Sequence, residues 1–256
     1  MAELWFVGAG LADERDISRR GREALERCDV VFAEEYTAVL APGSVERLAQ
    51  ELRRPITRID RTSLESGRPI MEALAEGRRV GLLVVGDPFA ATTHVALRVD
   101  AEKAGHTWRY VPNASVLSAA ASFLGLMHYR FGRTVSLPFP EPGFAPASPV
   151  EFVRKNRAEG LHSLVLLDLR PLEGRFLRAH EAIAILKERD AARSLFVDTL
   201  EMGVVARVGA DDAAAWWRPL AVLERIDFGA PLHCLVVPAP ELHFEEQAAI
   251  ECFRVR

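Results

Sequence analysis

The segment VVGDPFAATTH runs from Val84 to His94 and follows a β-favouring stretch that begins at Val80. The stretch ends abruptly at Gly86-Asp87-Pro88, and small residues then lead into a helical pattern. Open α/β sheets bind ligands at tight loops on the carboxyl ends of their strands. The glycine permits a sharp turn and the proline fixes φ, so this loop offers one acid and accessible main chain to a neutral or cationic ligand. The segment therefore predicts an α/β fold with a binding loop here.

Hydrophobic periodicity alternates between strand and helix along the first half of the chain. This alternation is typical of parallel βαβ units, in which each helix carries the chain back to the next strand. We therefore expect a mostly parallel sheet covered by helices. The expected strands are 4–7, 30–33, 55–59, 80–85 and 108–111, and the expected helices are 18–27, 69–76 and 95–104.

The second half continues the alternation and contains a proline-rich stretch at 138–149. That stretch is expected to be a loop, and both a binding loop and a plain surface connector fit its composition. We expect an N-terminal α/β domain at 1–112 and a C-terminal α/β domain at 113–256. The expected helices are 115–124, 150–159 and 179–187, and the expected strands are 135–137, 164–169, 204–207 and 232–237.

Composition excludes several classes of protein. The net charge of −4 comes from charged residues of mixed sign, which gives no electrostatic case for nucleic-acid binding. The cysteines Cys28, Cys234 and Cys252 form no Cys-x-x-Cys pair, so neither a disulfide framework nor a zinc site is expected. The chain has no apolar run of about 18 residues and no basic leader. We expect a cytoplasmic protein without a membrane partner.

A series of short motifs extends over nearly the whole chain. The motifs are GAGL at 8–11, DERDI at 13–17, EYT at 35–37, GDPF at 86–89, ATTH at 91–94, NAS at 113–115, GL at 125–126, YRFG at 129–132, LLDL at 166–169, ARVGAD at 206–211 and PLH at 231–233. Together, and in this order, they resemble the diphthine synthases. That group is part of the tetrapyrrole-methylase-like family of S-adenosylmethionine-dependent methyltransferases.

The resemblance implies a fold, a reaction and partners. The fold is two α/β domains of the tetrapyrrole methylase type, with a mostly parallel N-terminal sheet, a mixed C-terminal sheet and the active site in the interdomain cleft. The reaction is successive methylation of the amino nitrogen on a modified histidine of translation elongation factor 2, by a homodimer. S-adenosylmethionine is already an activated donor, so no metal is required. The resemblance identifies no side chain as the proton acceptor.

The resemblance also implies which residues contact the cofactor. By their sequence context alone, turn, helix-cap and core roles are the more ordinary interpretation of these positions, and only the resemblance assigns them to the cofactor. The implied cofactor residues are Leu11, Asp87, Ala90, Ser115, Val116, Leu167, Val208 and His233. Thr92, Thr93 and His94 are expected to cap the helix that follows them. A group of acids near the first strand ends is expected on the substrate side: Asp13, Glu14, Asp16, Glu34 and Glu35.

Three alternatives remain open on the sequence. The first is a methyltransferase of the same fold that acts on a tetrapyrrole or on ribosomal RNA. The second is an NAD-dependent oxidoreductase, although Gly8 and Gly10 lack the third glycine of a dinucleotide-binding motif. Glu34 and Glu35 keep that alternative open because an acid at the end of the second strand could bind ribose. The third is a relative that binds cofactor without turnover.

Overall fold

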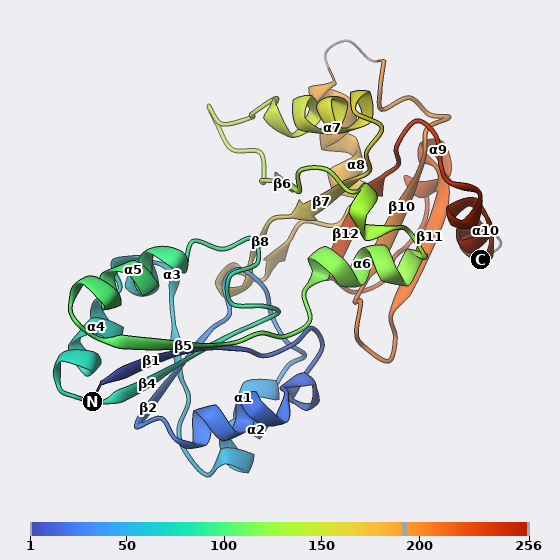
Figure 1. Ribbon diagram of the computed structural model, residues 1–256. Coiled ribbons are helices and arrows are strands. Elements are labelled where there is room, and N and C mark those ends of the chain that lie inside the picture. Colours follow the sequence, from blue (N-terminus) through green and yellow to red (C-terminus); the bar gives the residue numbers. More distant parts are fainter. Residues whose placement is uncertain (1, 191–193, 255–256) are drawn as a thin grey trace. The chain divides into compact units, whose positions relative to one another are not determined.

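The computed structural model describes residues 2–190 and 194–254, and the chain divides into two compact units, residues 1–116 and 117–256. Each unit is built on its own five-stranded sheet (Figure 1). The α/β class predicted from the sequence is confirmed. The domain boundary expected at 112/113 stays a prediction.

The sheet of the first unit has the strand order β3-β2-β4-β1-β5, and every neighbouring pair is parallel. Its strands are β1 Glu3–Gly8, β2 Val30–Glu34, β3 Thr57–Ile59, β4 Arg79–Val84 and β5 Thr107–Val111. Its helices are η1 Glu14–Asp16, α1 Arg19–Glu26, α2 Ser44–Leu52, α3 Arg61–Ser66, α4 Arg68–Ala75 and α5 Val95–Lys103.

Helices cover both faces of this sheet, as parallel strands with continuous apolar runs require. Val7 belongs to a buried cluster that includes Leu25 of α1 and Leu48 of α2. The preceding residue, Phe6, belongs to a separate buried cluster with Ile70 of α4 and Leu97 of α5. Successive side chains of a strand point to opposite faces, so α1 and α2 lie on one face and α4 and α5 on the other.

The strand order places a topological switch between β1 and β4. From β1 the chain continues through α1 to β2, while from β4 it continues through α5 to β5 on the other side of the sheet. Neighbouring strands whose connections leave in opposite directions open a crevice outside their carboxyl ends, and ligands of open α/β sheets bind there. The fold therefore directs attention to the loops after β1 and β4.

The second unit contains a mixed sheet with the order β11-β10-β12-β7-β6. Only the β6–β7 pair is parallel, and the other three pairs are antiparallel. Its strands are β6 Val135–Leu137, β7 Ser163–Leu167, β10 Glu201–Ala206, β11 Ala214–Pro219 and β12 His233–Val237, with a separate β8 Leu169–Arg170 and β9 Arg175–Phe176 hairpin around η3 Pro171–Glu173. The mixed C-terminal sheet is confirmed.

The helices of the second unit also cover both faces of its sheet. Helix α6 packs Leu124 near Gly203 of β10, and α10 packs along β11. Ile183 and Leu186 of α8 are fully buried in the main core with Val153 of α7. The helices are α6 Val116–Leu124, η2 His128–Arg130, α7 Ser148–Ala158, α8 Ala179–Arg189, α9 Leu220–Leu223 and α10 Phe244–Arg254.

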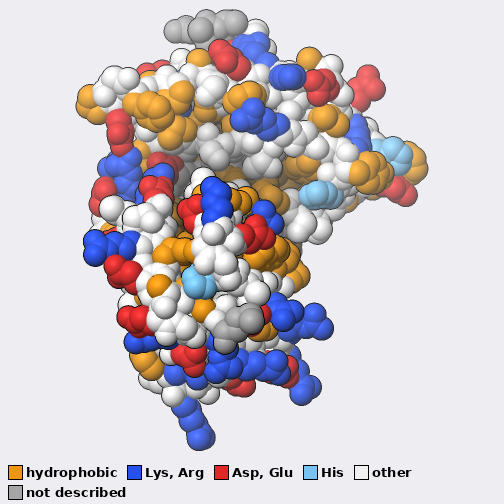
Figure 2. Space-filling model, turned by 60° about the vertical axis from the view of Figure 1, so that its left-hand side comes forward, with side chains coloured by type: hydrophobic (Ala, Val, Ile, Leu, Met, Phe, Trp, Pro, Cys, Tyr) orange, Lys and Arg blue, Asp and Glu red, His pale blue; other side chains and the backbone are white. Residues whose placement is uncertain are grey.

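The surface carries charges of both signs side by side. Figure 2 shows Lys and Arg side chains interleaved with Asp and Glu on the face in view. Pairs of opposite charge also lie four residues apart on helices, as in Arg19–Glu23, Arg61–Glu65 and Arg68–Glu72. Arg130 is paired with the buried Glu246. This face therefore presents no broad field of one sign.

The three cysteines are all free thiols. Burial raises the pKa of Cys28 and of Cys234 to about 12, so both stay protonated and unreactive at neutral pH. Cys252 on α10 is exposed. Within residues 2–190 and 194–254, no helix is long and apolar enough to cross a membrane, and no group of three His, Cys, Asp or Glu side chains could hold a metal ion.

Candidate functional site

The loops after β1 and β4 are joined by main-chain hydrogen bonds at the carboxyl edge of the first sheet. The amide of Ala9 donates to the carbonyl of Val84 at 2.8 Å, and the amide of Gly86 donates to the carbonyl of Gly10 at 2.7 Å. The two loops are thereby held in register beyond the last residues of their strands. These hydrogen bonds therefore fix the two loops relative to each other at the edge where open α/β sheets bind ligands.

Close packing at this edge explains the first two glycines. A Cβ added to Gly8 would lie 2.6 Å from Cβ of Asn113 and 2.7 Å from the carbonyl oxygen of Gly86. Gly10 has a φ of +84°, which L side chains rarely adopt, and an added Cβ would lie 2.3 Å from Cβ of Asp16. Both glycines are therefore needed because neighbouring segments lie too close for a side chain, whether or not a nucleotide binds there.

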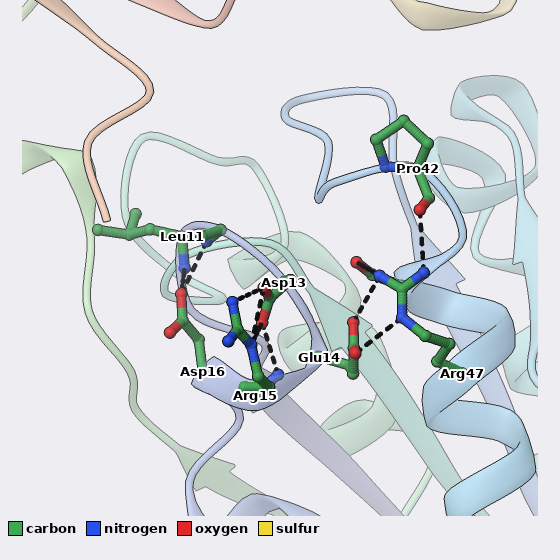
Figure 3. A network of polar contacts seen from close by, with 9 residues as sticks. Leu11, Asp13, Glu14, Arg15, Asp16, Pro42 and Arg47 are labelled. Carbon is green, nitrogen blue, oxygen red and sulfur yellow. Dashed lines mark hydrogen bonds and ion pairs between the residues drawn. The ribbon is translucent and has the colours of Figure 1, made fainter. Parts of the chain in front are cut away.

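Asp16 shapes the loop that carries Leu11, as Figure 3 shows. Its Oδ2 accepts hydrogen bonds from the amide of Leu11 at 3.1 Å and from the amide of Ala12 at 2.7 Å. A carboxylate that accepts from two successive amides fixes the main chain between them. Leu11 itself is half-buried. The main chain of this implied cofactor residue is thus held by an acid five residues further along.

A second acid anchors the same segment to α2 (Figure 3). Glu14 is paired with Arg47, whose Nε and Nη2 donate to its two oxygens at 2.7 and 2.9 Å. Nη1 of Arg47 also donates to the carbonyl of Pro42 at 3.2 Å. The hydrogen bond from Arg47 is the largest influence on the pKa of Glu14, which lies below its ordinary value. Both side chains therefore stay charged and paired at neutral pH.

The acids expected on the substrate side are all engaged inside the unit. Asp13 pairs with Arg15 in η1 and Glu35 pairs with Arg58 of β3. Glu34 is fully buried, and its oxygens accept from the amides of Tyr36 and Thr37 at 2.7 and 2.6 Å and from the Thr37 hydroxyl at 2.7 Å. These contacts give the acids roles within the unit, and their position on the substrate side stays a prediction.

Asp87 combines a turn role with a link to β5. Its Oδ1 accepts from the amide of Phe89 at 3.0 Å, the hydrogen bond of an Asx turn. Its Oδ2 accepts from the hydroxyl of Tyr110 and, at 3.4 Å, from the amide of Asn113. A carboxylate has about four acceptor sites, so Asp87 retains capacity for a cationic or hydroxyl-bearing ligand. The same loop places Ala90 half-buried, with its amide bonded to the carbonyl of Asp87 at 3.1 Å.

Thr92 and His94 do not cap α5 with their side chains, contrary to expectation. The Thr92 hydroxyl and Nδ1 of His94 each donate to the carbonyl of Pro88, both at 2.8 Å. A carbonyl only accepts, so Nδ1 of His94 carries the proton. These two hydrogen bonds close the loop after β4 on itself.

The implied cofactor residues fall into two sets, one in each unit. In the first unit the structure brings Leu11 and Asp87 to one edge, and the chain after β5 continues from there to Ser115 and Val116, both half-buried. In the second unit, His233 pairs with Ala206 at one end of the sheet, and Leu167 lies one residue beyond the Leu166–Cys234 pair. Val208 follows Arg207, whose amide donates to the carbonyl of Leu232 at 2.8 Å.

The ring of His233 is committed to the protein. Its Nδ1 accepts from the amide of Ala179 at 3.2 Å, so Nε2 carries the proton and donates to the carbonyl of Ala230 at 3.0 Å. Any contact of His233 with a ligand therefore uses the ring face or the main chain. Burial is the largest cause that lowers the pKa of His233, to about 4.

This shift predicts a loss of stability in acid. The folded-state pKa lies below the ordinary value of 6.5, so the neutral ring favours folding above pH 6.5 and that contribution is lost as the pH falls towards 4. We expect the free energy of unfolding, measured in urea, to decrease over this interval by about 3 kcal/mol more in the native chain than in H233Q. Equal decreases in the two proteins would show that His233 is not the titrating group.

The chain is similar in sequence and in structure to known proteins. The sequence profile described as Tetrapyrrole (Corrin/Porphyrin) Methylases matches residues 3–223. A diphthine synthase of Methanothermobacter thermautotrophicus is 40% identical over 247 residues, 95% of this chain and 92% of that protein. A diphthine synthase of Methanosphaerula palustris is 40% identical over 98% of each chain. A crystal structure of diphthine synthase superposes with a TM-score of 0.89 at 34% identity, covering 98% of this chain and 96% of the other.

Proposed function

We propose that this chain, which belongs to the tetrapyrrole (corrin/porphyrin) methylase family and within it to the diphthine synthases, methylates the amino nitrogen of the modified histidine of translation elongation factor 2 in successive steps. S-adenosylmethionine is the proposed donor. The observation that carries the proposal is the set of joined loops at the topological switch of the first unit, where the glycine, Asp87 and Asn113 motifs of the family converge.

The residues of the site fit S-adenosylmethionine. The donor carries a sulfonium and an ammonium group, and the remaining acceptor capacity of Asp87 suits a cation. Leu11 offers an apolar side chain on a fixed main chain, and Ala90 leaves space beside the loop. We assign cofactor contacts to the whole predicted set: Leu11, Asp87, Ala90, Ser115, Val116, Leu167, Val208 and His233.

Methyl transfer from S-adenosylmethionine depends on the alignment of donor and acceptor more than on a reactive side chain. When bound, S-adenosylmethionine supplies an activated methyl group. The loops after β1 and β4 then have to hold the donor rigidly and keep water away, since transfer in a line from sulfur to nitrogen depends on geometry. The attacking amine must be neutral before each transfer, so a proton leaves it each time. We assign no side chain to that proton.

The oxidoreductase alternative fits the structure poorly. A dinucleotide fold places β2 beside β1 and uses an acid at the end of β2 for the ribose. Here β4 separates β2 from β1, and Glu34, at the end of β2, is fully buried with both carboxylate oxygens bonded to neighbouring residues. An acid in that position has no means of reaching a ribose.

We also propose that the protein is a homodimer that works in the cytoplasm, with elongation factor 2 as its protein partner. The relatives named diphthine synthase support the choice of substrate. The interleaved charges of Figure 2 favour a local contact with that partner over a long-range attraction.

Mass spectrometry of the substrate tests this proposal. Elongation factor 2 carrying the modified histidine is incubated with the protein and S-adenosylmethionine, and we expect its mass to increase in steps of one methyl group. Parallel incubations with a tetrapyrrole and with ribosomal RNA should show no transfer. S-adenosylhomocysteine should raise the melting temperature of the protein, and NAD should leave it unchanged. Transfer to the tetrapyrrole or the RNA, with none to the elongation factor, would refute the assigned substrate.

A further inference from the structure

Asn113, the second residue after β5, contacts all the loops of the predicted cofactor site in the first unit. Its side-chain Nδ2 donates to the carbonyl of Gly8 at 2.9 Å and to the carbonyl of Asp16 at 3.0 Å. Its main-chain amide donates to Oδ2 of Asp87 at 3.4 Å. One residue thus bridges the loop after β1, the end of η1 and the loop after β4.

The partners of Asn113 require an amide at this position. The carbonyls of Gly8 and Asp16 can only accept hydrogen bonds, so they demand the two protons of an NH₂ group. Oδ1 accepts from the amide of Ala114 at 2.8 Å, so the same side chain also needs an oxygen. An aspartate in this place would set a carboxylate against two carbonyl oxygens. Only asparagine combines the right donors with the length that fits against Gly8.

The bridge extends from Asn113 to the ligand-facing main chain. Asp16, whose carbonyl accepts from Asn113, uses its carboxylate to hold the amides of Leu11 and Ala12. In the other direction, Val116 is the last residue of the first unit and Ser115 precedes it. Fixing Asn113 therefore fixes the start of the segment that carries both residues.

We propose that Asn113 is the positioning residue that assembles the cofactor-binding loops of the first unit. The inference rests on the proposed function in one respect, namely that S-adenosylmethionine uses these loops. Asn113 touches no reacting atom. It acts through Gly8, Asp16 and Asp87, and its loss should weaken the affinity for cofactor while leaving the rate at saturating cofactor close to that of the native chain.

The test compares N113D with N156D. Asn156 is the other asparagine of the chain and has an equivalent role in the second unit, where its Nδ2 donates to the carbonyl of Arg133 at 2.8 Å and to Oγ of Ser163 at 2.9 Å. Titration calorimetry with S-adenosylhomocysteine, below the unfolding temperature of each protein, should show a Kd at least about tenfold higher for N113D, since two hydrogen bonds are lost. N156D should lower the melting temperature without changing the Kd. Equal Kd values for N113D and the native chain would overturn the proposal.

Amide hydrogen exchange separates this proposal from the proposed function. In N113A, and in N113D if it folds, the amides of Leu11 and Ala12 should exchange faster than in the native chain, while amides of the second unit should be unchanged. If the native chain bound no S-adenosylhomocysteine, the proposed cofactor would be wrong, and faster exchange at these two amides would still support the bridge. Unchanged exchange at both amides in N113A would refute it.

Discussion

Replacing Ala90 with tryptophan is expected to abolish binding of S-adenosylhomocysteine while leaving the protein folded. Ala90 lies in the tight loop after β4, half-buried, with its amide bonded to the carbonyl of Asp87. An indole adds a large apolar volume at a position next to the carboxylate proposed to face the cofactor. Because Ala90 belongs to neither buried cluster of this unit, the core has no reason to rearrange. Calorimetric titration and circular dichroism measure the two properties.

A matched variant is available at the opposite edge of the same sheet. Ala104 is exposed and ends α5, which runs from the carboxyl edge of the sheet to its amino edge. A104W adds the same side chain far from the Asp87 loop, and we expect it to bind S-adenosylhomocysteine with native affinity. If A90W and A104W bind equally well, the cofactor lies outside the loop after β4.

Replacing Glu246 with alanine is expected to destabilise the second unit by about 3–5 kcal/mol, because a buried charge network would lose its only acid. The side chain of Glu246 is fully buried and accepts from the guanidinium of Arg130, from the amide of Met127 at 3.0 Å, from Nε2 of His162 at 3.1 Å and from the amide of His243 at 3.0 Å. Burial alone would raise the pKa of Glu246, but these donors outweigh it and the pKa is lowered. Urea denaturation followed by tryptophan fluorescence measures the loss.

The neighbouring residue supplies the control for this prediction. Glu245 is exposed and lies on the same first turn of α10, and its carboxylate approaches Nδ1 of His243 only at 3.8 Å. E245A should change the free energy of unfolding by about 0.5 kcal/mol or less. The large loss in E246A should also grow smaller in acid, since the carboxylate contributes above its ordinary pKa of 4.5 and loses that contribution as the pH falls through its lowered value. Equal losses for the two variants would contradict the network.

The elements with a clear period were predictable from the sequence. The strand expected at 80–85 is β4, and the helix expected at 18–27 is α1, which Ser18 begins by accepting from the amide of Gly21. Helix α2 was not predicted, although Val45, Leu48 and Leu52 have helical spacing, because a glycine and a proline precede it and its first residue has no side-chain cap. β11 was also missed.

β11 was missed because the burial of its residues depends on its pairing with β10. The adjacent tryptophans of β11 are unequally buried: Trp217 is fully buried and Trp216 only partly. Their exposure alternates because β11 pairs along the whole of β10 at the edge of the sheet. An edge strand with aromatic residues on both faces has no alternating hydrophobic pattern to read. Only the pairing in space reveals it.

The sequence indicated a candidate position for the site, which stays a prediction, but not the contacts that hold its loops together. The sequence placed the binding loop after the fourth strand, and resemblance named Leu11, Asp87 and Ala90; their contacts with cofactor stay predictions. The sequence did not indicate that Asn113 joins the loops, because its partners come from separate segments. They are the carbonyls of Gly8 and Asp16 and the carboxylate of Asp87. A polar residue directly after a strand end was the available signal. The substrate-side position of the acids stays a prediction, and the sequence did not indicate their partners, such as Arg47 of α2 for Glu14.

The exposed thiol of Cys252 allows the native chain to be labelled with a fluorophore at a single site. Cys28 and Cys234 are buried with pKa values of about 12, so a maleimide dye at neutral pH attaches to α10 alone. Two batches labelled with donor and acceptor fluorophores can then be mixed without any mutation. Energy transfer that appears on mixing would report the encounter of two polypeptides directly and follow its exchange in real time.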